Sequence, residues 1–122
     1  MRLKGQVTTG LGEISQWMDK LKDFYHKKTG TLLFPGTLNV ALEQEWSVPD
    51  DALRLEAADY GGEVPILLVP CLFEGRQAFI VRTDKGESGD GRHPKTIIEI
   101  ASDLNLRKIH RLKDDDWVKI EV

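Results

Sequence analysis

Short segments in which apolar and polar residues alternate recur from one end of the chain to the other, and this pattern restricts the possible folds most. Alternation places apolar side chains on one face of a β-strand and polar side chains on the other. Clusters of glycine, proline, aspartate and glutamate separate the segments, as expected of turns between strands. The predicted strands are residues 3–9, 37–42, 64–73, 77–82, 96–101 and 117–122.

One long segment follows a helical period instead. Apolar side chains three and four positions apart predict an amphipathic helix over about residues 14–28, and Gly30 is placed to end it. A short helix is predicted over residues 104–110, with Ser102 or Asp103 as its cap. About six short strands with one substantial helix favour a mainly β fold. We therefore expect a small closed barrel with this helix packed on it and short extra helices.

Length and composition limit the functional class. The 122 residues are most simply one domain, residues 1–122. We expect a cytoplasmic protein without membrane association, because no apolar run approaches about 20 residues and the N-terminus lacks the apolar region of a secretion signal. A net charge of -3 argues against binding nucleic acid through phosphate neutralisation. Cys71 is the only cysteine, so we expect a buried, unreactive thiol and neither an intrachain disulfide nor a cysteine zinc cluster.

The segment from Pro35 to Leu42 combines a turn with a strand. Pro-Gly marks the turn, and the alternation that follows directs three apolar side chains into a core. Thr37 and Asn39 then emerge side by side on the other face. Two short oxygen-bearing side chains suit a hard cation such as Mg²⁺, which takes one or two protein oxygens and completes its shell with water and phosphate. The alternative is that both residues merely lie on an exposed strand face.

Three further stretches each allow two interpretations. The loop from Thr9 to Glu13 has two glycines, which suit either a phosphate cradle of backbone N–H groups or an ordinary tight turn. Glu99 interrupts an apolar strand, so it either lies exposed at an edge or lines a pocket, and exposure is the commoner outcome. Asp114 to Asp116 suggest a cation, but consecutive aspartates in a turn do not converge on one ion, which favours a solvated turn. The polar, glycine-rich residues 84–92 predict a loop.

Taken together, several separated motifs resemble one family, the archaeal-type CTP-dependent riboflavin kinases. The motifs occur in the family's order and with similar spacing, and they span nearly the whole chain. The resemblance implies a six-stranded cradle-loop (RIFT-like) barrel that transfers the γ-phosphoryl group of CTP to the 5′-hydroxyl of riboflavin, giving FMN. The matching pieces are Leu3-Lys4-Gly5-x-Val7, Thr9-Gly10-Leu11-Gly12-Glu13, Pro35-Gly36-Thr37-Leu38-Asn39-Val40, Ile97-Ile98-Glu99-Ile100-Ala101, Asn105-Leu106-Arg107 and Leu112-Lys113-Asp114.

The resemblance also implies roles for individual residues. In that family the threonine and asparagine of the Gly-Thr-Leu-Asn motif hold Mg²⁺, which implies a magnesium site at Thr37 and Asn39. The glutamate of the Ile-Ile-Glu-Ile motif contacts the flavin, which implies a flavin-binding role for Glu99. Glu99 is also the candidate catalytic residue, as a base or as a group that orients the flavin hydroxyl. The residues implied on the nucleotide are Thr9, Gly10, Leu11, Gly12, Glu13 and Ile14, together with Leu104, Asn105, Leu106 and Arg107.

Two positions depart from the family pattern. Ile14 stands where the family usually has a second flanking glycine, and a side chain there narrows the conformations open to the loop. Gly91 occupies the flavin-binding position eight residues before the glutamate, where the family usually has a threonine. The alternative function is therefore a non-catalytic barrel that binds nucleotide or flavin as a regulatory module. A DNA-binding barrel of the related transcription-factor type is a third alternative, but it needs a basic face that the net charge does not indicate.

Overall fold

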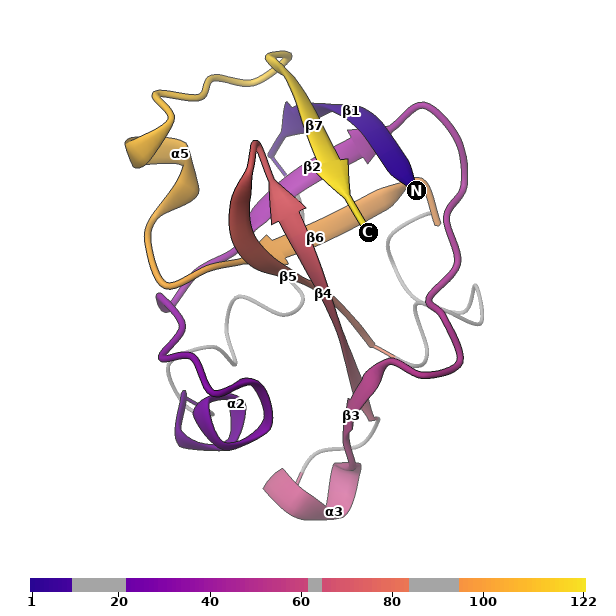
Figure 1. Cartoon of the computed structure of the whole chain (residues 1–122), viewed down its shortest axis with the longest axis vertical. Coiled ribbons are helices and arrows are strands. Elements are labelled where there is room, and N and C mark those ends of the chain that lie inside the picture. Colours follow the sequence, from indigo (N-terminus) through magenta and orange to yellow (C-terminus); the bar gives the residue numbers. More distant parts are fainter. Residues whose placement is uncertain (10–21, 62–64, 84–94) are drawn as a thin grey trace.

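The computed structural model describes residues 1–9, 22–61, 65–83 and 95–122 (Figure 1). Its strands are β1 (Arg2–Thr8), β2 (Leu38–Leu42), β3 (Leu53–Leu55), β4 (Ile66–Phe73), β5 (Arg76–Thr83), β6 (Ile97–Ala101) and β7 (Trp117–Glu121). Its helices are α2 (Lys22–Thr29), α3 (Ala57–Tyr60) and α5 (Leu106–Ile109). Within the described ranges no helix has the length and apolar character needed to cross a membrane.

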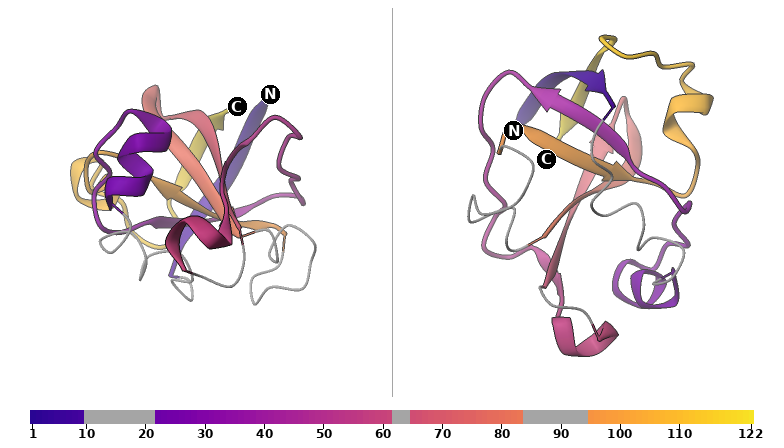
Figure 2. Two further views of the ribbon diagram at one scale, coloured as in Figure 1. Left: turned by 90° about the horizontal axis from the view of Figure 1, so that it is seen from below. Right: turned by 180° about the vertical axis from the view of Figure 1, so that it is seen from behind.

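Six of these strands close into an antiparallel barrel. The strand order is β3-β4-β5-β6-β2-β1-β7, and a further pairing between β4 and β7 joins the two ends of the sheet. β3 pairs with the beginning of β4 and lies outside the ring, so β4 extends from the barrel toward β3 and α3 (Figure 1). The two chain ends lie side by side, and Val122 N donates to Met1 O at 2.9 Å (Figure 2). The predicted mainly β barrel is confirmed.

The hairpin between β4 and β5 follows directly from its turn residues. Glu74 and Gly75 both adopt positive φ, 46° and 81°, as a tight two-residue hairpin turn requires. Pro70 lies within β4 and is exposed. On one side it pairs with β5, but on the other side the β3 pairing ends at Leu68 and the β7 pairing starts at Leu72. The missing N–H of proline therefore costs no ladder hydrogen bond, because this stretch of β4 is a local edge of the sheet.

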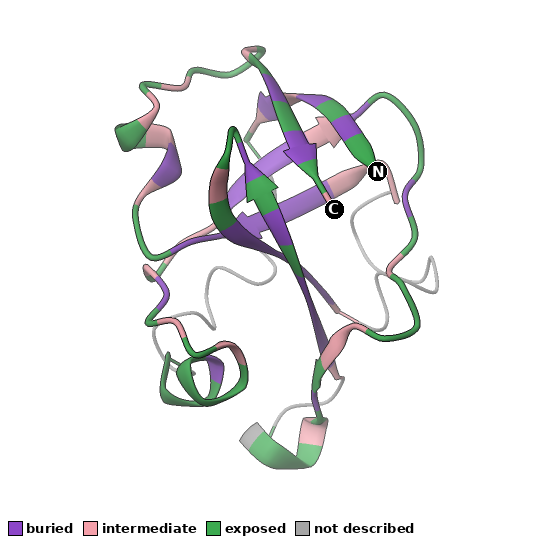
Figure 3. Ribbon diagram, in the orientation of Figure 1, coloured by how far each residue is buried: buried purple, intermediate pink, exposed green. Residues whose placement is uncertain are grey.

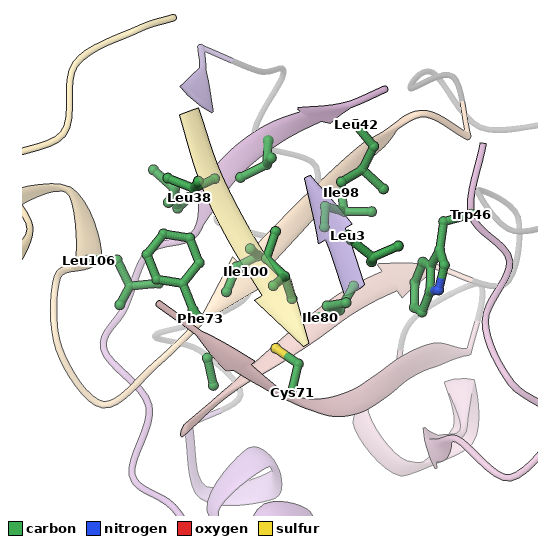
Figure 4. Packing of buried hydrophobic residues seen from close by; sticks show 14 of the residues in the cluster. Leu3, Leu38, Leu42, Trp46, Cys71, Phe73, Ile80, Ile98, Ile100 and Leu106 are labelled. Atoms are coloured by element: carbon green, nitrogen blue, oxygen red, sulfur yellow. The ribbon is translucent and has the colours of Figure 1, made fainter. Parts of the chain in front are cut away.

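The barrel interior is filled by the apolar side chains of the alternating strands (Figure 4). On β1 the inward positions are Leu3, Gly5 and Val7, and the residues between them are more exposed (Figure 3). Gly5 faces β2 so closely that a Cβ atom there would lie 2.5 Å from Ala41 O. This close approach explains why glycine stands at that position. The single cysteine, Cys71, is buried in the same core, as expected.

A second buried cluster lies on the opposite face of β4, β5 and β6. On β5 the interior side chains are at positions 78 and 80, whereas Phe79 and Val81 belong to the second cluster. Tyr25 of α2 and Leu33 of the following segment cover this face. These strands are therefore buried on both faces over part of their length, and an outward-pointing side chain there does not reach solvent.

Three local expectations were only partly met. The helix predicted over residues 14–28 is described from Lys22 onward, and its apolar stripe is split: Tyr25 is fully buried, whereas Phe24 is 39% exposed. Gly30, with φ 74°, follows the helix end as predicted. The cap of α5 is Asn105, whose side chain accepts from Lys108 N at 3.2 Å, and not Ser102 or Asp103. β3 and α3 were not predicted, because three- and four-residue elements carry too little periodicity.

Candidate functional site

Thr37, Asn39 and Glu99 meet where β2 runs beside β6. Asn39 lies directly opposite Glu99 in the strand register, so both side chains project from the same face. Thr37, just before β2, donates from Oγ1 to Glu99 Oε1 at 2.7 Å. The two residues implied for magnesium and the residue implied for the flavin are thus one cluster, although about 60 positions separate them in the sequence.

Asn39 and Glu99 are buried and Thr37 is partly buried, which corrects the expected exposure of Glu99. Glu99 is 4% exposed and Asn39 is 9% exposed, whereas the sequence favoured an exposed glutamate and allowed an exposed strand face as the alternative for Asn39. Glu99 also pairs with Val81, and Val81 belongs to the second buried cluster. The face that carries the polar side chains is therefore the face that α2 and the segment after it partly cover. Of the two interpretations of Glu99, the structure supports a position lining a buried site.

The oxygen atoms of the cluster fit a hard cation. Asn39 Oδ1 is buried and accepts no hydrogen bond from any residue that the structure describes. Because Thr37 uses its proton toward Glu99, the lone pairs of its hydroxyl oxygen remain available to a ligand. An amide oxygen, a hydroxyl oxygen and a nearby carboxylate are the donors that Mg²⁺ prefers. Among the described residues, no group of three or more histidine, cysteine, aspartate or glutamate side chains could hold a metal ion.

A cleft of about 210 Å³ opens next to this cluster. It joins the Gly36–Thr37 turn to the segment 104–107, which the family resemblance assigns to the nucleotide. Phe34 N donates to Ser102 O at 2.7 Å and thereby holds the two segments together. The cleft is lined by Phe34, Gly36, Thr37, Leu38, Ile100, Leu104, Asn105, Leu106 and Arg107.

Local structure explains how the 104–107 segment is presented at the cleft. Leu106 is buried in the barrel core, close to Phe73 in Figure 4, and fixes α5 against the barrel. Asn105 caps the same helix. Arg107 therefore follows an anchored residue and projects at the rim, with its side chain 41% exposed. This placement lets a cation reach a bound anion without being buried itself.

Thr9 and Arg107 are linked by one carboxylate. Thr9 Oγ1 donates to Asp114 Oδ2 at 2.9 Å, and Arg107 Nη2 donates to Asp114 Oδ1 at 3.0 Å. These hydrogen bonds from Thr9 and Arg107 lower the pKa of Asp114 below its ordinary value. The run of aspartates is a turn as predicted, but Asp114 has a specific contact that the sequence did not indicate. The feature of the sequence that could have pointed to Asp114 is its place in the Leu112-Lys113-Asp114 motif.

The remaining predicted site residues lie outside the described residues. These are Gly10, Leu11, Gly12, Glu13, Ile14 and Gly91. The structure thus brings together Thr37, Asn39, Glu99 and the 104–107 segment, and it connects Thr9 to Arg107 through Asp114.

Comparison with known proteins shows which family the sequence of this chain matches. A model of CTP-dependent riboflavin kinases, described as domain of unknown function DUF120, matches residues 7–122. A riboflavin kinase of Staphylothermus marinus is 29% identical over 98% of this chain and 90% of that protein. One of Methanopyrus kandleri is 32% identical over 97% of this chain and 80% of that protein.

Other relatives are longer than the matched region. A riboflavin kinase of Methanocella arvoryzae is 30% identical over 97% of this chain, which spans only 55% of that protein. The matches to these three relatives nevertheless cover 97% or 98% of this chain. The chain therefore belongs to the family of CTP-dependent riboflavin kinases.

Proposed function

We propose that this protein is a riboflavin kinase that transfers the γ-phosphoryl group of CTP to riboflavin. The observation that carries this proposal is the largely buried oxygen cluster of Thr37, Asn39 and Glu99 beside a cleft whose lining includes residues 104–107. Phosphoryl transfer requires mainly that two substrates are positioned and that charge is neutralised. Family membership supports the phosphotransferase activity, and the choice of CTP as donor follows from the family alone.

Thr37 and Asn39 are proposed to hold Mg²⁺. When bound, the ion would neutralise charge on the nucleotide phosphates. Asn39 Oδ1 suits this role because it is an acceptor without a partner among the described residues. Such an atom is costly to bury unless something binds it. The hydrogen bond from Thr37 to Glu99 orients the threonine hydroxyl, so that its lone pairs are turned away from the carboxylate.

Glu99 is proposed to act on the flavin hydroxyl. The 5′-oxygen of riboflavin forms a bond to the γ-phosphorus, the bond from that phosphorus to the bridging oxygen breaks, and CDP leaves. The hydroxyl proton must depart in this step. Glu99 is the buried carboxylate of the cluster, so it can orient the hydroxyl or accept its proton. The first loop from Thr9 to Ile14 and the segment ending at Arg107 are proposed to bind the nucleotide, and Gly91 to lie at the flavin.

The direct test is product formation. The purified protein is incubated with riboflavin, MgCl₂ and either CTP or ATP, and FMN is separated by chromatography. We expect FMN with CTP, little with ATP, and none when the divalent cation is chelated. FMN formed equally well with ATP would contradict the proposed donor, and FMN formed in the presence of chelator would contradict the metal site. Binding of CDP or riboflavin without any product would instead favour the non-catalytic module.

A further inference from the structure

Asp114 connects two parts of the proposed nucleotide site that are far apart in the sequence. Thr9 directly follows β1 and begins the first loop, whereas Arg107 belongs to α5. The Asp114 carboxylate uses one oxygen for each: Oδ2 accepts from Thr9 at 2.9 Å, and Oδ1 accepts from Arg107 at 3.0 Å. Among the described residues, the Asp114 carboxylate thus forms a direct side-chain link between the two segments.

The backbone around Asp114 is held on both sides. Asp115 N donates to Val7 O at 2.7 Å, and Val7 N donates to Asp116 O at 2.8 Å, which binds the turn to β1. Leu112 N donates to Arg107 O at 2.8 Å, which binds the preceding residues to the end of α5. Main-chain hydrogen bonds therefore fix the position of the Asp114 carboxylate independently of its contacts with Thr9 and Arg107.

We propose that Asp114 is a positioning residue for the nucleotide, which holds the Thr9 end of the first loop and the Arg107 guanidinium in a fixed relation. This inference rests on the proposed function. Arg107 has five N–H donors, so one directed at Asp114 leaves others free to meet a phosphate or the base. Without the carboxylate, the half-exposed arginine would have to be ordered by the nucleotide itself, and binding would weaken.

The test measures nucleotide binding rather than turnover. The dissociation constant of CDP in the presence of Mg²⁺ is determined by calorimetry for the wild-type protein and for Asp114→Asn, Thr9→Val and the double variant. Asp115→Asn is the matched control, because it removes the same charge one residue away, and Asp115 is exposed and takes part in the turn through its backbone N and O atoms. Thermal unfolding of each variant is recorded in parallel.

We expect Asp114→Asn to weaken CDP binding about threefold to fivefold, the upper part of the range for an exposed ion pair. The double variant should bind no more weakly than Asp114→Asn, because Thr9 acts through that carboxylate. Thr9→Ser, which keeps the hydroxyl, should recover most of the loss seen with Thr9→Val. Binding by Asp114→Asn equal to that of Asp115→Asn would overturn the inference, and so would additive losses in the double variant.

The same titrations separate this inference from the proposed function. If the wild-type protein binds CDP but forms no FMN, the catalytic proposal fails, and the CDP affinities of the variants still decide the role of Asp114. If the wild-type protein does not bind CDP, the nucleotide assignment and the inference are both overturned. If Asp114→Asn lowers the melting temperature, the CDP affinities of Thr9→Val and Thr9→Ser are compared instead. Both variants keep Asp114, so a difference between them reports on the Thr9–Asp114 hydrogen bond.

Discussion

Replacing Asn39 by leucine should stabilise the protein while it removes the activity. Asn39 is 9% exposed, and its Oδ1 atom accepts no hydrogen bond from the described residues. A buried acceptor without a partner costs about 1–3 kcal/mol, and leucine has a similar volume without that acceptor. We therefore expect Asn39→Leu to increase the free energy of unfolding by about 1 kcal/mol in the absence of metal.

The magnitude can be converted into a temperature. For 122 residues, an unfolding entropy of about 2.1 cal/mol/K per residue gives about 0.26 kcal/mol per degree. A gain of about 1 kcal/mol therefore corresponds to a rise of about 4 °C in Tm. Loss of a ligand that stabilises transition-state charge typically lowers kcat about 100-fold or more. Stability and activity should thus change in opposite directions, which a merely structural asparagine would not produce.

The assays are thermal unfolding with and without MgCl₂, and FMN formation at saturating substrates. Gln77→Leu is the control, because Gln77 is an exposed strand residue and replacing its amide side chain by leucine should change neither quantity appreciably. Unchanged kcat in Asn39→Leu would refute the metal assignment. A loss of stability above about 1 kcal/mol would show that the amide makes a stabilising hydrogen bond in the native protein. Either result would refute the inference that the unpartnered Asn39 Oδ1 atom is a metal ligand.

Three further predictions concern the site and the core. Thr37→Val should cost about 1–3 kcal/mol in denaturant unfolding, because it removes a hydrogen bond to the buried Glu99 carboxylate, whereas Thr37→Ser should cost less; equal losses would contradict this. Gly5→Ala should destabilise the barrel by about 1–3 kcal/mol, because its Cβ would lie 2.5 Å from Ala41 O, and an unchanged Tm would count against this close approach. Burial raises the pKa of Cys71 to about 12, so the folded thiol should resist alkylation at pH 8–9 and react only on unfolding. Because the unfolded thiol ionises near pH 9.0, the stability from this group is present below pH 9.0 and lost as the pH rises toward 12, a loss that Cys71→Val should reduce.

Much of the barrel was predictable because strand patterns are local. The interior positions of β1 follow from the alternation of its residues, and the hairpin between β4 and β5 follows from Glu74 and Gly75 in the turn. The motif residues Thr37, Asn39 and Glu99 were also identified from the sequence, through their order and spacing. The sequence of a single strand does not show which other strands pair with it. The direct contact of Thr37 with Glu99 was therefore not predicted.

Tertiary structure decided which polar residues are buried. Alternation distinguishes two faces of a strand, but it does not say whether a second layer covers the outer one. Here Tyr25 and Leu33 help to cover the face that carries Glu99, so a residue expected at an open edge lies 4% exposed. Tertiary structure also decided the contacts of the exposed Asp114, because its hydrogen bonds with Thr9 and Arg107 depend on the docking of a turn onto β1. The sequence by itself thus determined the strands and the chemistry that they carry, whereas packing between distant segments decided which groups meet, because burial is a property of the assembled layers.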